Sequence, residues 1–225
     1  MHRRGSGHRG DHRASQLADR HVIRGLDHVV FVVLDLDTAV AEHRKRGFTV
    51  TPGGEHAGGL THNALVGFQE GSYLELIAFH DFAPATGKHS WAPVAERGGG
   101  WADFALLSND VAEDAAALGE LTARAPEDGG RTRPDGIAIA WRVVRLEKPL
   151  PFLIEDLTAR DLRVPHGAAA AHANGTTGLA RIVLGAMDPA RDAERYALLR
   201  ERGAPEVEVR RADRDGLLDV SFRPG

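Results

Sequence analysis

The sequence predicts an α+β protein built from repeated modules whose strands pair mainly in antiparallel fashion. Three observations predict this fold. An apolar strand followed by a capped helix occurs three times along the 225 residues. Strand-like runs outnumber helices, and short turns such as "EGS", "PDG" and "RDG" join many neighbouring runs, which favours antiparallel pairing. Strands and helices do not alternate one for one, so a doubly wound parallel sheet is disfavoured.

The first module is expected over residues 24–82. It begins with an apolar run, 29–33, inside "LDHVVFVVLDLDTAV". Asp37 is expected to cap the following helix and Gly47 to end it. The runs "HNALVGF" and "SYLELIAF" then predict two further strands.

The second module is expected over residues 100–158, after a linker over 83–99. Its strand "WADFALLS" precedes an alanine-rich helix with Asp110 as N-cap and Glu113 three positions later. The runs "IAIAWRVVRL" and "LPFLIEDL" predict the strands that complete this module.

A third, shortened module is expected over residues 178–225, after a linker over 159–177. Its helix is predicted to begin with Asp188 as N-cap and Pro189 at the first helical position, and to end at Gly203. The runs "EVEVRRA" and "LLDVSF" predict its remaining strands.

The composition is that of an ordinary soluble protein, with 42% apolar and 27% charged residues and a net charge of −4. This balance gives no field that would collect nucleic acid or an anionic membrane, so neither partner is expected. The absence of cysteine excludes disulfides and thiolate chemistry. No secretory or membrane-spanning segment is evident, and a cytoplasmic protein is expected. Residues 1–23, which are rich in arginine and histidine, are interpreted as a disordered basic tail.

Ionisable residues recur at matching positions of the apolar strands. On the first strand of each module, one residue lies seven positions before the capping-region aspartate: His28, Asp103 and Arg181. An alignment of the last strands places Glu75 opposite Glu155. Burying such groups is costly unless they are paired or bound to a cation.

If the two sheets face one another, four of these residues converge in a cleft: His28, Glu75, Asp103 and Glu155. One imidazole and up to three carboxylates suit a divalent Zn, Mn, Fe or Ni ion. The alternatives are structural: His28 as a hydrogen-bonded core residue, Glu75 on a solvent-facing strand surface, Glu155 at an exposed strand end and Asp103 in a local pair.

Four further residues are candidates for substrate binding. His62 and Asn63 begin an apolar strand, where they either line a pocket or end the preceding loop. Trp141 and Arg142 lie in "WRVVRL", and Arg142 either holds an anionic group or is a surface arginine.

The stretch "LDHVVFVVLDLDTAV…LTHNALVGFQEGSYLELIAF" resembles the opening module of glyoxalase-like proteins of the vicinal oxygen chelate superfamily. The later "RPDGIAIAWRVVRL…LPFLIEDL" is similar to their second half. The resemblance implies paired βαβββ units whose curved antiparallel and mixed sheets surround a cleft. In metal-dependent members, ligands come from the first and last strands of paired modules, which here are the positions of His28, Glu75, Asp103 and Glu155.

The sequence departs from this family pattern in two places. Relatives usually carry histidine or glutamine on the first strand of the second module, where this sequence has Asp103. The third module also allows modules one and three to pair, which would bring Arg181 into the cleft and favour an anionic ligand over a metal.

The resemblance implies metal-dependent lyase or isomerase chemistry on a small molecule, through a metal-stabilised enolate with Glu75 or Glu155 as base. Dioxygenation is less expected, because its two-histidine, one-carboxylate set is not evident. The main alternative is a metal-free binding or sequestering protein of the bleomycin-resistance type, with tryptophans lining its pocket. In a third reading the charged residues are structural ion pairs, and exposed sheet edges form a homodimer.

Overall fold

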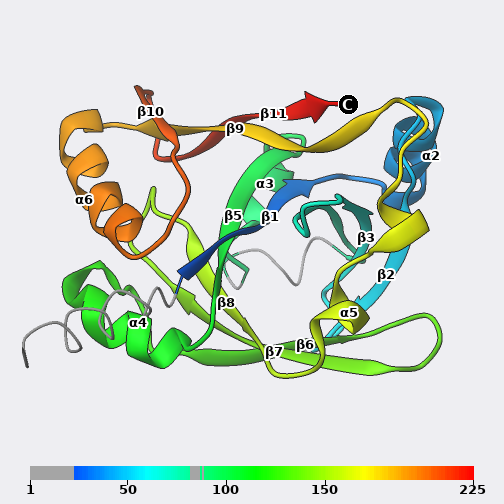
Figure 1. Ribbon diagram of the computed structural model, residues 1–225, viewed down its shortest axis with the longest axis horizontal. Coiled ribbons are helices and arrows are strands. Elements are labelled where there is room, and N and C mark those ends of the chain that lie inside the picture. Colours follow the sequence, from blue (N-terminus) through cyan, green and yellow to red (C-terminus); the bar gives the residue numbers. More distant parts are fainter. Residues whose placement is uncertain (1–22, 82–86, 88) are drawn as a thin grey trace, which may run out of the picture.

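The computed structural model describes residues 23–81, 87 and 89–225. Eight strands close into a barrel in the order β1-β4-β3-β2-β6-β7-β8-β5 (Figure 1). The predicted tail over 1–23 lies outside the described residues, except that Ile23 is already part of the first strand. The barrel strands are β1 (Ile23–Val32), β2 (Thr51–His56), β3 (Thr61–Gly67), β4 (Tyr73–Phe79), β5 (Gly100–Ser108), β6 (Glu127–Thr132), β7 (Ala138–Arg145) and β8 (Phe152–Asp156).

The barrel consists of two modules that are joined at two seams. Within the modules, β1 pairs parallel with β4, and β5 pairs parallel with β8. The long seam joins β1 to β5 in antiparallel fashion, and the short seam joins β2 to β6. The predicted α+β fold, with curved sheets of two βαβββ modules around a cleft, is therefore confirmed.

Local capping signals set the helix boundaries, with one correction. The helices are α2 (Leu36–Lys45), α3 (Ala92–Glu96), α4 (Val111–Leu118), α5 (Arg160–Arg163) and α6 (Pro189–Glu201). The prediction of Asp37 as N-cap was wrong: the Asp35 carboxylate accepts the hydrogen bond from Thr38 N, and Asp37 lies in the first helical turn. Asp110 and Asp188 cap α4 and α6 as predicted. The predicted linkers contain α3 and α5.

The third module forms a separate three-stranded sheet. The strands β9 (Thr176–Ala186), β10 (Glu208–Arg211) and β11 (Gly216–Pro224) have the order β10-β9-β11 and lie along the upper edge of the molecule in Figure 1. Arg181 of β9 is 47% exposed and pairs with Glu208 and Asp219. Modules one and two, not one and three, therefore enclose the cleft, and Arg181 does not enter it.

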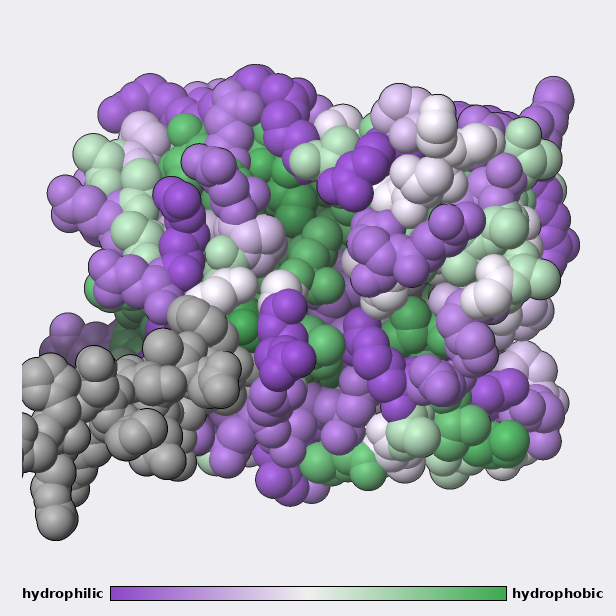
Figure 2. Space-filling model, viewed as in Figure 1, coloured by the Kyte–Doolittle hydropathy of each residue, from purple (hydrophilic) through white to green (hydrophobic). Residues whose placement is uncertain are grey.

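Alternation along the barrel strands separates two apolar regions. Outward residues such as Val29, Leu76 and Phe104 pack with helix residues and with the third sheet into the main core. Inward residues such as Val30 and Phe152 form a smaller cluster inside the barrel. Figure 2 shows polar side chains over most of the viewed face, with apolar side chains mainly in the hollows between them. No helix in the described part of the chain is long and apolar enough to cross a membrane.

Candidate active site

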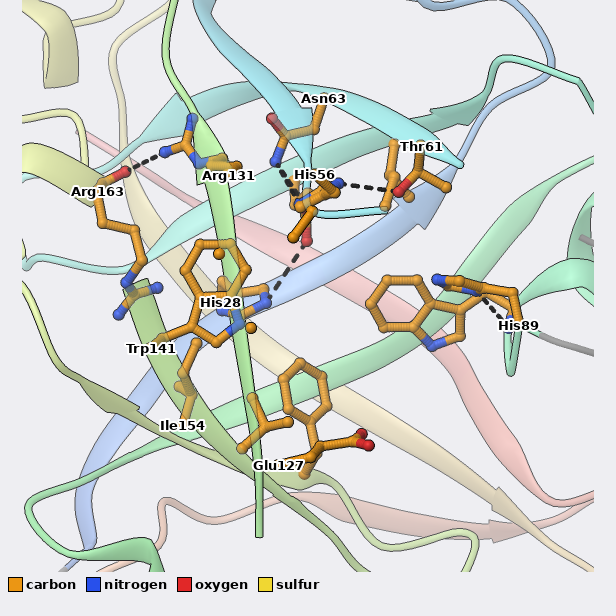
Figure 3. Close-up of a pocket in the computed structure, with 18 of the residues that line it drawn as sticks. His28, His56, Thr61, Asn63, His89, Glu127, Arg131, Trp141, Ile154 and Arg163 are labelled. Atoms are coloured by element: carbon orange, nitrogen blue, oxygen red, sulfur yellow. Dashed lines mark hydrogen bonds and ion pairs between the residues drawn. The ribbon is translucent and has the colours of Figure 1, made fainter. Parts of the chain in front are cut away.

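A cavity of about 270 Å³ lies inside the barrel (Figure 3). One part of its wall is apolar and includes Trp91, Trp141 and Phe152. The other part carries ionisable and amide groups: His28, His56, Asn63, Glu75, His89 and Arg131. Side chains of His28, His56 and Asn63 point toward the same region of the cavity.

Glu75 is the centre of the polar group. Its side chain is buried on β4, where the Oε1 atom accepts a 2.6 Å hydrogen bond from Asn63 Nδ2. His56 Nε2 lies 3.4 Å from the same oxygen, and His28 Nε2 lies 3.6 Å from Oε2. Two imidazoles, carried by β1 and β2, therefore approach the two different oxygens of the Glu75 carboxylate on β4.

The orientation of His28 is fixed from behind by Asp27. His28 Nδ1 lies 2.5 Å from Asp27 Oδ1, and the ring stacks on Tyr73 with centroids 4.6 Å apart. A register shift in the β1–β5 pairing between Leu26 and His28 lets these neighbouring residues serve one site. When the protonated Nδ1 donates its hydrogen bond to the Asp27 carboxylate, the lone pair of Nε2 faces Glu75. With this tautomer, Nε2 faces the carboxylate oxygen as an acceptor, and a cation between them would contact both atoms.

A buried arginine holds Asp27 in turn. Arg163 donates 2.8 Å hydrogen bonds from Nη1 and Nη2 to the two carboxylate oxygens of Asp27, and a third to the Tyr73 hydroxyl. Burial alone would raise the pKa of Asp27, but Arg163 and then His28 hold it well below its usual value. Asp27 is therefore an ionised anchor for His28.

The environment of Glu75 likewise favours the carboxylate form. Burial would raise its pKa, but the hydrogen bond and charge of His56, the charge of His28 and the hydrogen bond from Asn63 lower the pKa to about 2. Thr61 Oγ1 lies 2.9 Å from His56 Nδ1 and orients that ring. Glu75 is thus ionised throughout the physiological pH range.

This donor set fits a divalent metal ion. Two neutral imidazole nitrogens and one carboxylate form the set used by many mononuclear Fe, Zn and Mn sites. The facing acceptors His28 Nε2 and Glu75 Oε2 supply a structural reason for a cation at this point. Asp27 gives His28 the carboxylate partner that metal-ligating histidines usually have.

Asp103 does not join His28 and Glu75. Its buried carboxylate contacts Lys148 Nζ at 2.6 Å and Trp91 Nε1 at 3.3 Å. Trp91 lines the cavity, whereas Asp103 is not part of the cavity wall. The structure therefore places Asp103 in a local polar contact behind Trp91.

Glu155 lies on the outer face of β8, where it accepts a hydrogen bond from Val111 N at the start of α4. Val30 and Ala105 each lie five residues before their helix N-cap, and they pair with Glu75 and Phe152 respectively. The structural counterpart of Glu75 is thus Phe152, and the sequence alignment of the last strands was three residues out of register. The expected convergence of four ligands is limited to His28 and Glu75.

The four predicted substrate-binding residues separate by strand face. Asn63 and Trp141 line the cavity. His62 and Arg142 are not part of its wall, and Arg142 forms an exposed ion pair with Asp128 at 2.6 Å. Period-two alternation explains the division, because neighbouring strand residues face opposite sides of a sheet.

Several cavity residues escaped the sequence analysis, among them His56, His89, Arg131 and Arg145. His56 and Arg131 show why. Both lie on glycine-rich strands, "TPGGEH" and "EDGGRT", that lack apolar alternation. Arg131 is 5% exposed and donates hydrogen bonds to the carbonyl oxygens of Gly53 and Arg163. Among the described residues, no carboxylate forms an ion pair with Arg131.

Comparison with known structures finds chains of similar structure. A hypothetical protein from Staphylococcus aureus superposes with a TM-score of 0.65 at 11% identity, over 85% of this chain and 87% of that one. A variant of Streptomyces coelicolor methylmalonyl-CoA epimerase, in complex with 2-nitronate-propionyl-CoA, is 22% identical over 60% of this chain and 99% of its own (TM-score 0.45). The Mycobacterium tuberculosis methylmalonyl-CoA epimerase is 19% identical over 61% and 91% of the two chains (TM-score 0.41).

Sequence comparison identifies the family. No protein of curated function has a significant match to this chain. A family model described as a glyoxalase-like domain, however, matches residues 26–200, which is most of the sequence. Together with the paired modules of the barrel, this match confirms the resemblance seen in the sequence. The chain belongs to the glyoxalase-like domain family and has the vicinal oxygen chelate fold.

Proposed function

We propose that the protein is a metal-dependent enzyme of the lyase or isomerase type, which acts on a small molecule in the barrel cavity. The observation that carries this proposal is the approach of His28 Nε2 and His56 Nε2 to the Glu75 carboxylate, at 3.6 and 3.4 Å. These three side chains would hold the ion. When bound, a divalent ion supplies electrostatic stabilisation of negative charge on a substrate oxygen.

The chain's own groups divide the remaining work. The low pKa of Glu75 suits a ligand better than a base, because efficient general bases have a pKa near the working pH. His89 also lines the cavity, and burial and the charge of Arg145 lower its pKa to about 4. His89 is therefore a neutral imidazole at pH 7 and supplies a proton acceptor outside the proposed ligand set.

The cavity wall favours an anionic substrate. Arg131 brings a buried guanidinium that forms no ion pair among the described residues, and Glu75 is the carboxylate whose charge acts on it. Arg145 contributes a second guanidinium, 5.7 Å from the ring centroid of Trp91 and 5.6 Å from that of Phe152. A carboxylate on the substrate would satisfy Arg131 while the aromatic side chains contact its apolar part.

A second candidate is metal-free binding of a small aromatic or amphipathic compound. The aromatic side of the cavity supports it, since Trp91, Trp141 and Phe152 all contribute to the wall. In this candidate His28 and Glu75 are polar groups of the cavity wall and hold no ion.

Metal content distinguishes the two candidates. Full-length, tag-free wild type, His28→Gln and Glu75→Gln proteins are incubated with Zn²⁺, Mn²⁺, Fe²⁺ or Ni²⁺, desalted and measured by elemental analysis. His166→Gln, at an exposed residue outside the cavity, is the matched control. We expect His28→Gln and Glu75→Gln to lose one equivalent that wild type and control retain. Equal metal content in all four proteins would refute the metal-dependent function. Metal-free ligand binding would then be the remaining candidate, and quenching of tryptophan fluorescence would measure it.

A further inference from the structure

The strands that carry the candidate active site also bring three metal-ligating side chains together outside the cavity wall: Glu55, His62 and His80. One ligand atom from each lies within 4.8 Å of the other two. Among the described residues, no other group of three or more histidine and acidic side chains has ligand atoms this close together. None of the three lines the barrel cavity.

The backbone fixes this arrangement. Glu55 of β2 lies directly opposite His62 of β3 in the antiparallel pairing. His62 pairs with Ala78 of β4, which places His80 one pleat further along the same face. The hydrogen bond from His80 N to Leu60 O, 3.1 Å long, continues that pairing beyond β4. Cross-strand geometry, rather than flexible loops, therefore sets the relative positions of the three residues.

Strand alternation separates this group from the inner one. His56 follows Glu55, and Asn63 follows His62, so that His56 and Asn63 line the cavity while Glu55 and His62 face away from it. The outer group thus has its own three donors and shares none with His28, His56 and Glu75.

The side chains already contact one another in a way that suits a cation. His80 Nε2 forms an ion pair with Glu55 Oε2, and the rings of His62 and His80 have centroids 4.1 Å apart. The His62 side chain is half-buried between two exposed ones, those of Glu55 and His80.

We propose that Glu55, His62 and His80 form a second, outer site for a divalent transition-metal ion, with Zn²⁺ as the best match. Two imidazoles and one carboxylate are a common zinc ligand set, in which water fills the remaining position. The Glu55 side chain is 55% exposed and the His80 side chain 39% exposed, so the site is open to solvent. The bound ion would join β2, β3 and the end of β4 and stabilise the fold through linkage.

The test uses the full chain in a Glu75→Gln background, which removes the proposed inner site. Binding of Zn²⁺ is measured by titration calorimetry, and Co²⁺ is used as a visible probe of the coordination. His62→Gln and His80→Gln are compared with His166→Gln, whose ring is also near the surface and whose Nδ1 contacts only the nearby Val164 carbonyl oxygen. Circular dichroism checks that each variant is folded, and Glu55→Gln serves as a third, independent ligand variant.

We expect the Glu75→Gln parent and the His166→Gln control to bind one more equivalent of Zn²⁺ than each outer-site variant. Addition of Zn²⁺ should also raise the Tm of the parent and control more than that of the outer-site variants. Equal stoichiometry and equal Tm shifts in all of these proteins would overturn the outer site. This outcome would not bear on the proposed inner site, because comparison of Glu75→Gln with wild type tests that site separately.

Discussion

The Asp27 carboxylate lies between the guanidinium of Arg163 and the imidazole of His28, so that its two oxygens serve both the fold and the cavity. Asp27 is fully buried and Arg163 is 2% exposed. A buried ion pair of this kind stabilises little relative to apolar packing, but removal of one partner leaves an uncompensated charge. Substitution of either partner should therefore lower the free energy of unfolding strongly.

Asp27→Asn should lower the free energy of unfolding by about 3 to 5 kcal/mol, because buried Arg163 loses its fully buried carboxylate partner and keeps only Asp156, which is partly exposed. Urea denaturation followed by circular dichroism measures the change. Asp135→Asn is the control, since Asp135 forms an ion pair with Arg133 in which the Asp135 side chain is exposed and the Arg133 side chain is half-buried. Its effect should stay below about 1 kcal/mol. Similar losses in the two variants would contradict the role assigned to Asp27.

Stability in acid should reveal the low pKa of Glu75. The folded-state value of about 2 lies below the ordinary value of 4.5, so the ionised group stabilises the fold above pH 4.5. That contribution declines as the pH falls from 4.5 toward 2. In the presence of a chelator, the urea midpoint of wild type should fall more steeply over this interval than that of Glu75→Gln. Parallel curves for the two proteins would show that Glu75 has an ordinary pKa.

Replacement of Arg145 should raise the pKa of His89. After burial, the charge of Arg145 is the largest cause of the low value of about 4. In Arg145→Gln the imidazole should titrate at higher pH, although burial still keeps its pKa below 6.5. Proton NMR titration, with the His89 signal assigned from His89→Gln, measures the shift. Arg142→Gln, three positions earlier on β7 and outside the cavity wall, should leave the titration unchanged.

Gly129→Ala should displace Trp141 from its place in the cavity wall. A Cβ atom at Gly129 would lie 2.5 Å from Trp141 Nε1, which is too close for both groups to keep their positions. We expect a destabilisation of about 1 to 3 kcal/mol and a change in tryptophan emission. Both effects should shrink in a Trp141→Phe background, which lacks the clashing nitrogen. An effect of equal size in that background would place the cause in the backbone instead.

Much of the fold could be predicted because its signals are local. Asp110 and Asp188 mark helix starts by their own hydrogen bonds, and the apolar runs mark the buried strands. The strands β2 and β6 were missed because they are rich in glycine. Pairing with neighbouring strands, rather than their own residue preferences, holds them in the sheet.

The site could be predicted only in part, because its remaining contacts depend on strand register. The cost of burying ionisable groups was sufficient to single out His28 and Glu75. His56 reaches Glu75 from a strand that the sequence alone presents as a turn. Phe152, not Glu155, takes the matching position in the second module, and that offset is fixed by hydrogen bonds between strands. Only the three-dimensional structure supplies this information.

The two seams of the barrel differ in length, so one of them should open more easily than the other. The β1–β5 seam extends over eight residue pairs, whereas the β2–β6 seam has only two, Glu55 with Thr132 and His56 with Arg131. Local opening is cheapest where the fewest backbone hydrogen bonds break, so the barrel should part along the shorter seam. Both pairs carry cluster residues, because His56 belongs to the inner group and Glu55 to the outer one. Opening of the barrel at this seam would separate His56 from Arg131, and closure would bring the two residues back together. Ligand entry through this seam would therefore change the geometry of the cavity's own binding residues.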